Sequence, residues 1–340
     1  MTIIFKCKTT EGFLIKILAE LLQNNIKTAC FVISKDGISL RMMDHHKKIL
    51  IDTNLYAENF SVYKFKLNAP RSIGLNLNHF YKMLKNIKKK DSIQLFINDD
   101  FPTDLGIKVI PKENNRTTTS TIKILNLQNL DIDIPGVLNG YGKCVIVSSS
   151  EYQKTIKDMN NIGNIINIVS KNFHIKFQCD AGGVLKRQVD FGEIEDSDNE
   201  NTEDEKEYNQ EFYTEQLVRI SKISGLSTNI QIFATEGYPL LIRSSVGNIG
   251  KISIYIKSKE LLEHENSYVQ DSDIEELYGK SQKFLYISDI TGSIFFPSFK
   301  YFKAIFEVSC SAIFFVFPLP LPIISLCENI LVVSVLLLVF

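Results

Sequence analysis

The chain has 340 residues, of which 44% are hydrophobic and 23% charged, with a formal net charge of −1. This composition is typical of a globular protein, and the chain is long enough for two domains with cores of their own. The near-zero charge hides an uneven distribution, because residues 193–207 hold nine acids and one lysine. The remainder therefore carries +7, which favours an anionic partner, although a solvated basic surface without a partner explains the charge equally well.

The six cysteines are scattered along the chain and show neither a CxxC pair nor the spacing of a metal site. The N-terminal residues do not resemble a signal peptide. We therefore expect reduced cysteines and a location in the cytosol or nucleus.

The first predicted elements are a helix and a set of alternating strands. Apolar residues at helical spacing form one stripe, made of Phe13, Ile17, Leu18, Leu21 and Leu22. After the turn signal Asp36-Gly37, apolar residues alternate with polar ones, with Ile38, Leu40 and Met42 on one face and then Ile49 and Ile51.

A second helix is predicted before the strand Asp91–Ile97. Its apolar side contains Leu77, Phe80, Tyr81, Leu84 and Ile87. Its other side carries lysines at helical spacing, namely Lys82, Lys85, Lys88 and Lys89. Proline and glycines then break the periodicity near residues 131–141, which predicts a linker.

The second half of the chain begins with a helix whose stripe is Tyr152, Ile156, Met159 and Ile162. The acidic run 193–207 is predicted to be a disordered loop. A further helical stretch near residues 214–227 precedes the strand Thr228–Ala234. From Val308 to Phe340 the only charged residue is Glu328.

An internal duplication is the strongest signal in the sequence. Gln94 and Gln231 occupy matching strands 137 positions apart, and Lys85 and Lys222 have the same separation. Upstream, Phe31–Leu40 resembles Ile168–Phe177, and Lys16 and Lys154 are 138 positions apart. One unit of about 130 residues therefore occurs twice, as helix, strands, helix, strands. This order predicts an α+β fold with helices on one face of antiparallel sheets.

All four predicted helices carry a basic outer face that has few acids, with Glu20 and Asp158 as exceptions. A solvated helix usually mixes charges of both signs. Lysines spread over several helices suit sequence-independent contact with DNA phosphates; the alternative is a lysine-rich solvated surface. The residues predicted to face DNA are Lys16, Lys82, Lys85, Lys88, Lys89, Lys154, Lys157, Arg219 and Lys222.

Over roughly residues 1–259 the chain resembles sliding clamps of the proliferating cell nuclear antigen type. Five segments carry the resemblance, in the order of the family: GFLIKILAELLQNNIKTACFVISKDGISLRMMDHH, LNLNHFYKMLKNIKKKDSIQLFI, IKILNLQNLDIDIP, YQKTIKDMNNIGNIINIVS and YPLLIRSSVGNIGKISIYI. The asparagine, isoleucine and lysine bias is similar to that of clamps from large DNA viruses. The resemblance implies two repeats of the clamp unit and a head-to-tail homotrimer. Twelve helices would line its central hole.

The implied function is a processivity factor that encircles double-stranded DNA without sequence preference and tethers DNA polymerase to it. Other implied partners are a clamp loader and proteins with a clamp-binding motif, in the nucleus or a viral replication compartment. The resemblance maps its pore-lining basic positions to Lys16, Lys82, Lys85, Lys154, Lys157 and Lys222. Two further pore positions depart from the family, because Gln23 and Asn161 are uncharged.

The resemblance also implies a pocket for partner peptides beside an interdomain connector. By position the pocket comprises Met43, Leu50, Ile132, Ile134, Pro239 and Tyr255, although several of these residues suit an ordinary core. The neighbouring run His45-His46-Lys47-Lys48 departs from the family and favours acidic partner peptides. The expected domains are residues 1–124 and 141–262, joined by the connector 125–140 and followed by a non-clamp extension over 263–340.

No motif favours an enzyme, a cofactor or a metal. Adjacent His45 and His46 on an extended segment point to opposite faces, so one ion cannot easily bind both. The apolar tail 308–340 is interpreted as a non-native extension, with a membrane tether or an added packed element as alternatives. The alternative function is a clamp-derived scaffold or regulatory protein, either a heterotrimer subunit or membrane-tethered, that does not encircle DNA.

Overall fold

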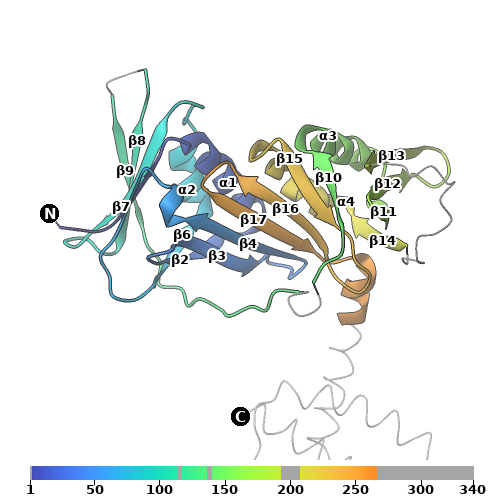
Figure 1. Cartoon of the computed structure of the whole chain (residues 1–340), viewed down its shortest axis with the longest axis horizontal. Helices are drawn as coiled ribbons and strands as arrows, with labels where there is room; N and C mark the ends of the chain where they lie inside the picture. The colour runs from blue at the N-terminus through green and yellow to red at the C-terminus, as the bar shows by residue number, and fades with distance from the viewer. Residues whose placement is uncertain (1, 114–115, 136–139, 193–206, 266–340) are drawn as a thin grey trace, which may run out of the picture. The chain divides into compact units, whose positions relative to one another are not determined.

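The computed structural model describes residues 2–113, 116–135, 140–192 and 207–265, which fall in one compact unit. Figure 1 shows this unit with its two halves side by side. Most of the acidic run and nearly all of the C-terminal extension, including the apolar tail, lie outside the described residues.

Two successive sets of elements follow the order that the duplication predicted. The first set is β1 (Ile3–Thr9), α1 (Gly12–Asn25), β2 (Thr28–Ile33), β3 (Gly37–Met43), β4 (Ile49–Tyr56), the 3-10 turn η1 (Ala57–Asn59), β5 (Val62–Phe65), β6 (Arg71–Asn76), α2 (Leu77–Leu84), β7 (Ser92–Asn98), β8 (Asp104–Ile110) and β9 (Thr118–Lys123). The second set is β10 (Cys144–Ser148), α3 (Ser149–Asn160), β11 (Ile165–Lys171), β12 (His174–Asp180), β13 (Lys186–Gly192), β14 (Tyr208–Tyr213), α4 (Thr214–Ile220), the 3-10 turn η2 (Ser221–Gly225), β15 (Asn229–Phe233), β16 (Leu240–Val246) and β17 (Gly250–Ile256). A helical stretch over residues 259–265 follows.

The duplication holds at the level of single residues. Helix α2 begins at Leu77 and α4 begins at Thr214, 137 positions later. Strand β1 pairs Lys8 with Gln94, and the matching strand β10 pairs Ile146 with Gln231. The offset is therefore 138 for the first strand of each repeat. It is 137 for the first helices, which begin at Gly12 and Ser149, and for the later elements.

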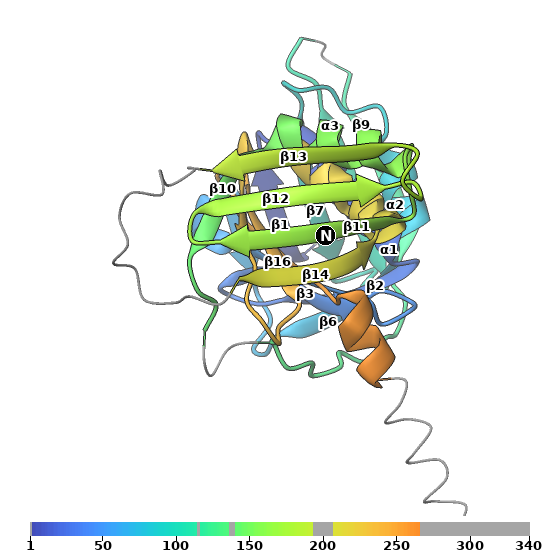
Figure 2. The same cartoon turned by 90° about the vertical axis from the view of Figure 1, so that its right-hand side faces the viewer.

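The two repeats share one eight-stranded sheet, with the order β10-β15-β16-β17-β4-β3-β2-β6. The joint between the repeats is the antiparallel pair β17–β4, in which Gly250 to Ile256 lie opposite Leu55 to Ile49. A five-stranded sheet, β5-β1-β7-β8-β9, belongs to the first repeat. A four-stranded sheet, β13-β12-β11-β14, belongs to the second and faces the viewer in Figure 2.

The duplication also relates the sheets to one another. The half-sheet β10-β15-β16-β17 matches β1-β7-β8-β9, and the half-sheet β4-β3-β2-β6 matches β13-β12-β11-β14. Within the chain, β17 joins β4. Their counterparts, β9 and β13, are edge strands in the sheets that the described residues form.

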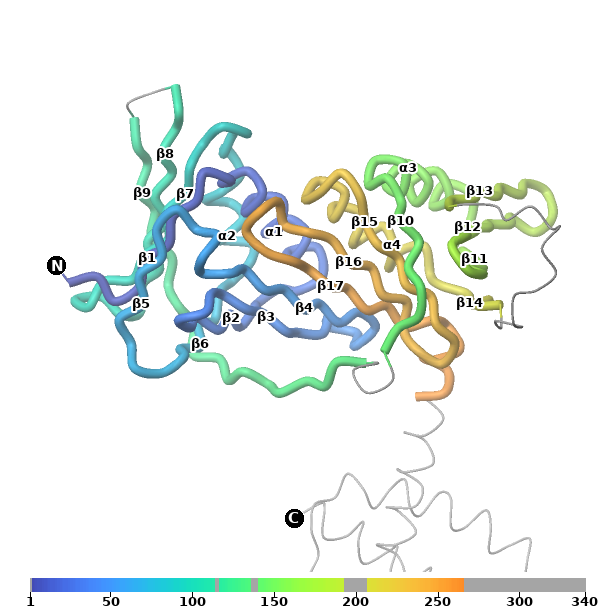
Figure 3. Tube along the Cα trace, viewed as in Figure 1, coloured from blue at the N-terminus to red at the C-terminus, as the bar shows by residue number. Residues whose placement is uncertain are grey.

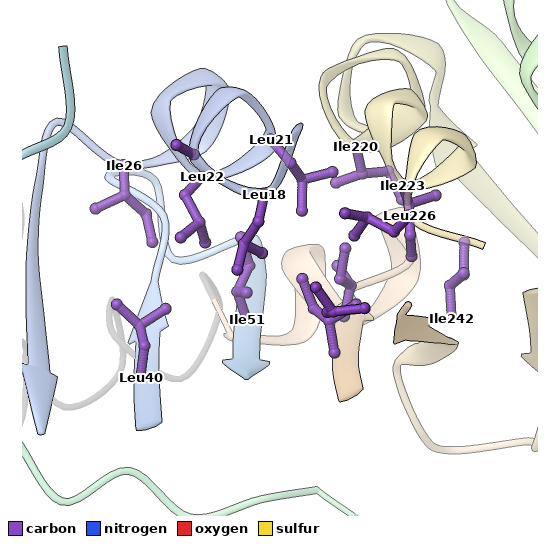
Figure 4. Packing of buried hydrophobic residues seen from close by; sticks show 14 of the residues in the cluster. Leu18, Leu21, Leu22, Ile26, Leu40, Ile51, Ile220, Ile223, Leu226 and Ile242 are labelled. Atoms are coloured by element: carbon purple, nitrogen blue, oxygen red, sulfur yellow. The ribbon is translucent and has the colours of Figure 1, made fainter. Parts of the chain in front are cut away.

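Helices cover one face of the eight-stranded sheet. Figure 4 shows α1 beside α4 and η2, with Leu21 of α1 near Ile220 and Leu18 of α1 above Ile51 of β4. These apolar side chains are buried, as the helical periodicity predicted. Because side chains alternate along a strand, Leu50 on the same strand points to the opposite face. The sheet therefore separates a helical side from a side that carries the connector.

Helix α2 is shorter than its periodicity predicted, and two of its expected lysines lie beyond its end. It stops at Leu84, whereas the prediction placed Lys88 and Lys89 on the same helical face as the earlier lysines. The N–H of Lys88 donates to Asp91 Oδ2 at 2.9 Å, and the N–H of Asp91 donates to the Lys88 carbonyl at 3.1 Å. This turn leads the chain out of the helix and into β7, because a side-chain acceptor replaces the helical partner.

Tyr152 of α3 contributes a buried hydroxyl to the core of the second repeat. The residue has no exposed surface, and its ring meets Phe177 edge-on at 6.2 Å. Among the described residues its hydroxyl has no hydrogen-bond partner. Such a group loses its hydration without compensation, so it destabilises the folded chain.

We predict that Tyr152→Phe raises the free energy of unfolding by about 1 kcal/mol, because it removes the unpaired hydroxyl and keeps the ring. Burial raises the pKa of Tyr152. The unfolded chain therefore loses this proton first above a pH of about 10, and the variant will lose less stability there. Urea unfolding at pH 7 and pH 10.5 measures both effects. Tyr152→Ala is the contrasting variant and will cost about 3–5 kcal/mol; a destabilised phenylalanine variant contradicts the assignment.

Candidate functional site

The predicted DNA-facing residues fall into exposed and partly buried groups. Lys82 on α2 and Lys154 and Lys157 on α3 are exposed, and so is Lys85 just after α2. Lys88 and Lys89 are also exposed, in the turn between α2 and β7.

Lys16 of α1 is only half-exposed, because it is held against its own helix and the next. Its Nζ donates to the carbonyl oxygen of Ile87 at 3.3 Å and lies 5.3 Å from the centre of the Phe13 ring. The ammonium group therefore bridges α1 and the turn after α2 while part of it stays open to solvent.

Lys222 lies in η2, after the end of α4, and pairs with an acid of the other repeat. Its Nζ is 2.7 Å from Glu20 Oε1 of α1, and the two side chains are 42% and 19% exposed. Desolvation and the nearby Glu20 carboxylate raise the pKa of Tyr81. Part of the charge that was predicted to face DNA is therefore compensated within the chain.

Arg219 of α4, which was also predicted to face DNA, is only partly exposed and pairs with an acid of the other repeat. Its Nη2 is 2.9 Å from Asp44 Oδ2, and the Asp44 side chain is fully buried. Sequence periodicity could not show this contact, because Asp44 follows β3 in the other repeat. The guanidinium group is therefore engaged within the chain, which reduces the charge that it offers to DNA.

The segment after β9 crosses the eight-stranded sheet on the side opposite the helices, as Figure 3 traces. Leu125 and Gly74 of β6 exchange two backbone hydrogen bonds, at 3.0 and 2.8 Å. A Cβ at position 74 would lie 2.6 Å from the Leu125 carbonyl oxygen, so glycine permits this approach. Further along, Arg41 Nη1 donates to the Ile132 carbonyl oxygen at 3.2 Å.

Five of the six residues predicted for the partner pocket gather in one apolar cluster. Leu50 and Tyr255 are buried there, and Met43, Ile132 and Ile134 pack against them. Desolvation raises the pKa of Tyr255, and the Asp52 carboxylate acts in the same direction. The cluster therefore combines the joint strands β4 and β17 with the connector.

The structure adds residues to this cluster that the sequence interpretation did not include: Leu241, Tyr141 and Phe233. Leu241 pairs with Tyr255 across β16 and β17, which strand alternation in the sequence could have indicated. Pro239, the sixth predicted residue, contacts the cluster through its backbone. Its carbonyl oxygen accepts a hydrogen bond from the Tyr141 hydroxyl at 3.0 Å.

A basic turn borders the cluster beyond β3. The N–H groups of Lys48 and Ile49 donate to Asp44 Oδ1 at 2.7 and 2.9 Å, which shapes the turn. His45, His46 and Lys47 are exposed on it. The ammonium group of Lys48 is less available to a partner, because its Nζ lies 4.9 Å from the centre of the Tyr213 ring.

Within the described ranges, no group of three or more histidine, cysteine, aspartate or glutamate side chains could hold a metal ion. No helix among these residues is long and apolar enough to cross a membrane.

Two equivalent repeats joined strand to strand, with helices on one side and a connector on the other, define a subunit of the sliding-clamp class. Family comparison agrees: the N-terminal domain of proliferating cell nuclear antigen matches residues 4–134, and its C-terminal domain matches residues 137–269. The chain belongs to the proliferating cell nuclear antigen family.

Two curated relatives illustrate the similarity. "Probable DNA polymerase sliding clamp 1" of Paramecium bursaria Chlorella virus 1 is 24% identical over 256 residues, which cover 75% of this chain and 96% of the relative. "Proliferating cell nuclear antigen" of Chaetomium thermophilum is 24% identical over 260 residues, which cover 75% and 97%. Equal identity to both gives no preference for a viral origin.

We predict that Arg219→Ala lowers the free energy of unfolding by about 3 kcal/mol, because it leaves the buried Asp44 carboxylate without its cation. Urea or thermal unfolding of the full chain measures this. Arg243→Ala is a suitable control, because that arginine lies in a sheet and stacks on the Phe233 ring at 4.9 Å. Equal, small decreases in both variants would contradict a structural role for the Asp44–Arg219 pair.

Proposed function

We propose that this chain is a DNA sliding clamp that closes into a ring around duplex DNA and tethers DNA polymerase to it. The observation that carries the proposal is the joint between β17 and β4, whose counterparts β9 and β13 are edge strands. A strand edge with unpaired backbone groups is a template for pairing with another chain.

Repetition of the internal joint explains how copies of the chain would assemble. If β9 of one copy pairs with β13 of the next, the five- and four-stranded sheets become one continuous sheet like the eight-stranded one. This contact is head-to-tail, so it closes into a ring when the rotation between copies permits it. Three copies would give six equivalent repeats, which is the homotrimer that the family resemblance implies.

The helical face would surround the DNA. Lys82, Lys154 and Lys157 are exposed there without a base-reading cluster of arginine, asparagine and glutamine. Lysines that contact phosphates bind any sequence and allow sliding. Lys16 and the turn residues Lys88 and Lys89 add positive charge to this face.

The connector cluster would receive partner proteins, including DNA polymerase and a clamp loader. It offers apolar anchors beside an extended segment, which is a common arrangement for binding short peptides. Lys47 and the two histidines at its border favour acidic residues in those peptides. Such a clamp acts by topology and carries out no reaction itself. Its place of action would be the nucleus or a viral replication compartment.

We assign residues 1–124 and 141–262 to the two clamp domains and 125–140 to the connector. The helical stretch 259–265 remains tied to the second domain, because Lys259 Nζ lies 3.1 Å from Glu211 Oε2 on β14. The extension beyond the clamp unit begins at residue 263.

The function is tested by the salt dependence of duplex binding. Duplex affinity falls as salt rises. We predict that the double variant Lys82→Ala with Lys154→Ala makes the slope of log affinity against log salt less steep, by about 0.9 for each phosphate that is no longer neutralised. The control is the double variant Lys171→Ala with Lys251→Ala, which removes the same charge from two exposed strand positions. Their strand neighbours Ser170 and Ile252 face the core, so these lysines point away from it, and the control will leave the slope unchanged.

Light scattering on the full chain will show three subunits per particle.

Equal slopes in the two double variants would contradict the helical face as the DNA-binding surface. A chain that stays monomeric at all concentrations would contradict the ring and favour a clamp-derived scaffold.

A further inference from the structure

An ion pair on the connector side of the eight-stranded sheet also holds the connector. Arg41 of β3 lies opposite Asp52 of β4 in the strand register, and its Nε is 3.2 Å from Asp52 Oδ1. Its Nη1 donates to the carbonyl oxygen of Ile132 at 3.2 Å. One guanidinium group therefore links a strand of the internal joint to the connector, which the planar fork of arginine donors permits.

The ion pair stands directly beside the connector cluster. Side chains two positions apart on a strand share a face, so Arg41 lies next to Met43 on β3. For the same reason Asp52 lies next to Leu50 on β4. Met43, Leu50 and Ile132 all belong to the cluster. The contact with Arg41 therefore holds the connector backbone at a residue whose own side chain packs on the cluster.

Asp52 keeps the Arg41 side chain in this orientation. The Asp52 side chain is only 11% exposed, so its attraction for a cation is screened less than at the open surface. Its second oxygen, Oδ2, accepts a hydrogen bond from Asn54 Nδ2 at 3.3 Å, which restrains the carboxylate. The guanidinium group is thus held through its Nε while its Nη1 reaches the connector.

The duplication supplies an internal comparison for this pair. Its counterpart in the second repeat is Gln178 of β12 with Gln188 of β13, which also lie opposite each other in register. Arg41 and Gln178 are 137 positions apart, which is the offset between the strand pairs β2–β3 and β11–β12. Gln178 Nε2 donates to Gln188 Oε1 at 3.0 Å. The repeat unit therefore accepts an uncharged pair at this place.

The charged pair occurs in the repeat where the connector crosses the sheet. Gln188 is exposed, and Figure 2 shows no described segment of the chain passing over β12 and β13 on this face. Arg41, in contrast, donates to the connector that passes over it. Since the sheet itself tolerates two glutamines, the additional contact with the connector is what distinguishes the charged pair.

We propose that Arg41 is a positioning residue for partner binding, which holds the connector over the cluster, and that Asp52 orients it. The inference rests on the proposed function, because it concerns the surface that receives partner peptides with apolar anchors. Without the pair, Ile132 and Ile134 lose the side-chain contact that keeps their backbone beside the cluster. A peptide must then order the connector before it can use both isoleucines, which lowers its affinity.

The test measures how often the connector opens in the full chain. Asp131 and Asp133 are exposed on the connector, so a protease that cleaves before aspartate reports local opening, and mass spectrometry locates the cut. In the double variant Arg41→Gln with Asp52→Gln, cleavage at these two positions will be roughly tenfold faster. The reason is that opening no longer breaks a hydrogen bond from a charged donor.

This double variant keeps the sheet intact, because it reproduces the pair Gln178–Gln188 of the second repeat. It will therefore unfold in urea at the wild-type midpoint. Its matched control is Lys259→Gln with Glu211→Gln, which neutralises another ion pair, at 3.1 Å, and leaves the net charge equally unchanged. The control will leave the rate of connector cleavage at the wild-type value.

Arg41→Lys separates the arginine fork from its charge. Lysine keeps the charge, but a single ammonium group cannot reproduce the separate Nε and Nη1 contacts with Asp52 and Ile132. The connector of this variant will therefore be cleaved about as fast as that of the double variant. A wild-type rate would mean that charge alone suffices and would overturn the positioning role of the fork.

Partner affinity is measured with a fluorescein-labelled peptide that carries leucine and phenylalanine anchors among aspartates. Its Kd will rise about threefold in the double variant, because only the closed connector presents both isoleucines. A wild-type cleavage rate in the double variant overturns the role of Arg41, and faster cleavage with an unchanged Kd overturns its link to partners. A wild-type chain that binds no such peptide contradicts the proposed partner surface. Cleavage needs neither partner nor ring, so it still decides whether Arg41 holds the connector.

Discussion

The antiparallel pairing of β4 with β17 is the contact on which the rest of the molecule depends. It joins two repeats that would otherwise end in open sheet edges, over Gly250 to Ile256 and Leu55 to Ile49. Backbone hydrogen bonds extend it at both ends, from Lys257 to Lys48 and from Tyr56 to Ile249. Because alternate positions of both strands present a side chain to the helices, this pairing aligns the helical layers of both repeats.

Strand alternation at this joint divides the molecule into two working surfaces. Ile51 and Ile254 point into the core beneath the helices, whereas Leu50 and Tyr255 point to the connector. The same two strands therefore support the face proposed for DNA and the cluster proposed for partner peptides. A disturbance of the joint would affect both surfaces, although they lie on opposite sides of one sheet.

The basic side chains on the helical face fall into two groups. Exposed lysines such as Lys82 and Lys154 suit phosphates, whereas Lys222 and Arg219 bind acids of the other repeat at 2.7 and 2.9 Å. Lysine content alone therefore overstates the charge available to DNA. The acids Glu20 and Asp44 reduce repulsion between basic helices and fasten the two repeats to each other.

The sequence by itself determined the duplication, the order of elements, the family and most of the connector cluster. These follow from local periodicity and from residues such as Gln94 and Gln231, which keep their spacing whatever the chain contacts. The tertiary structure decided which basic residues are free. Arg219 and Asp44 are far apart in sequence and belong to different repeats, and the end of α2 depends on a side-chain contact from Asp91. Long-range pairing and side-chain capping have no periodic signature, so only the folded chain could show them.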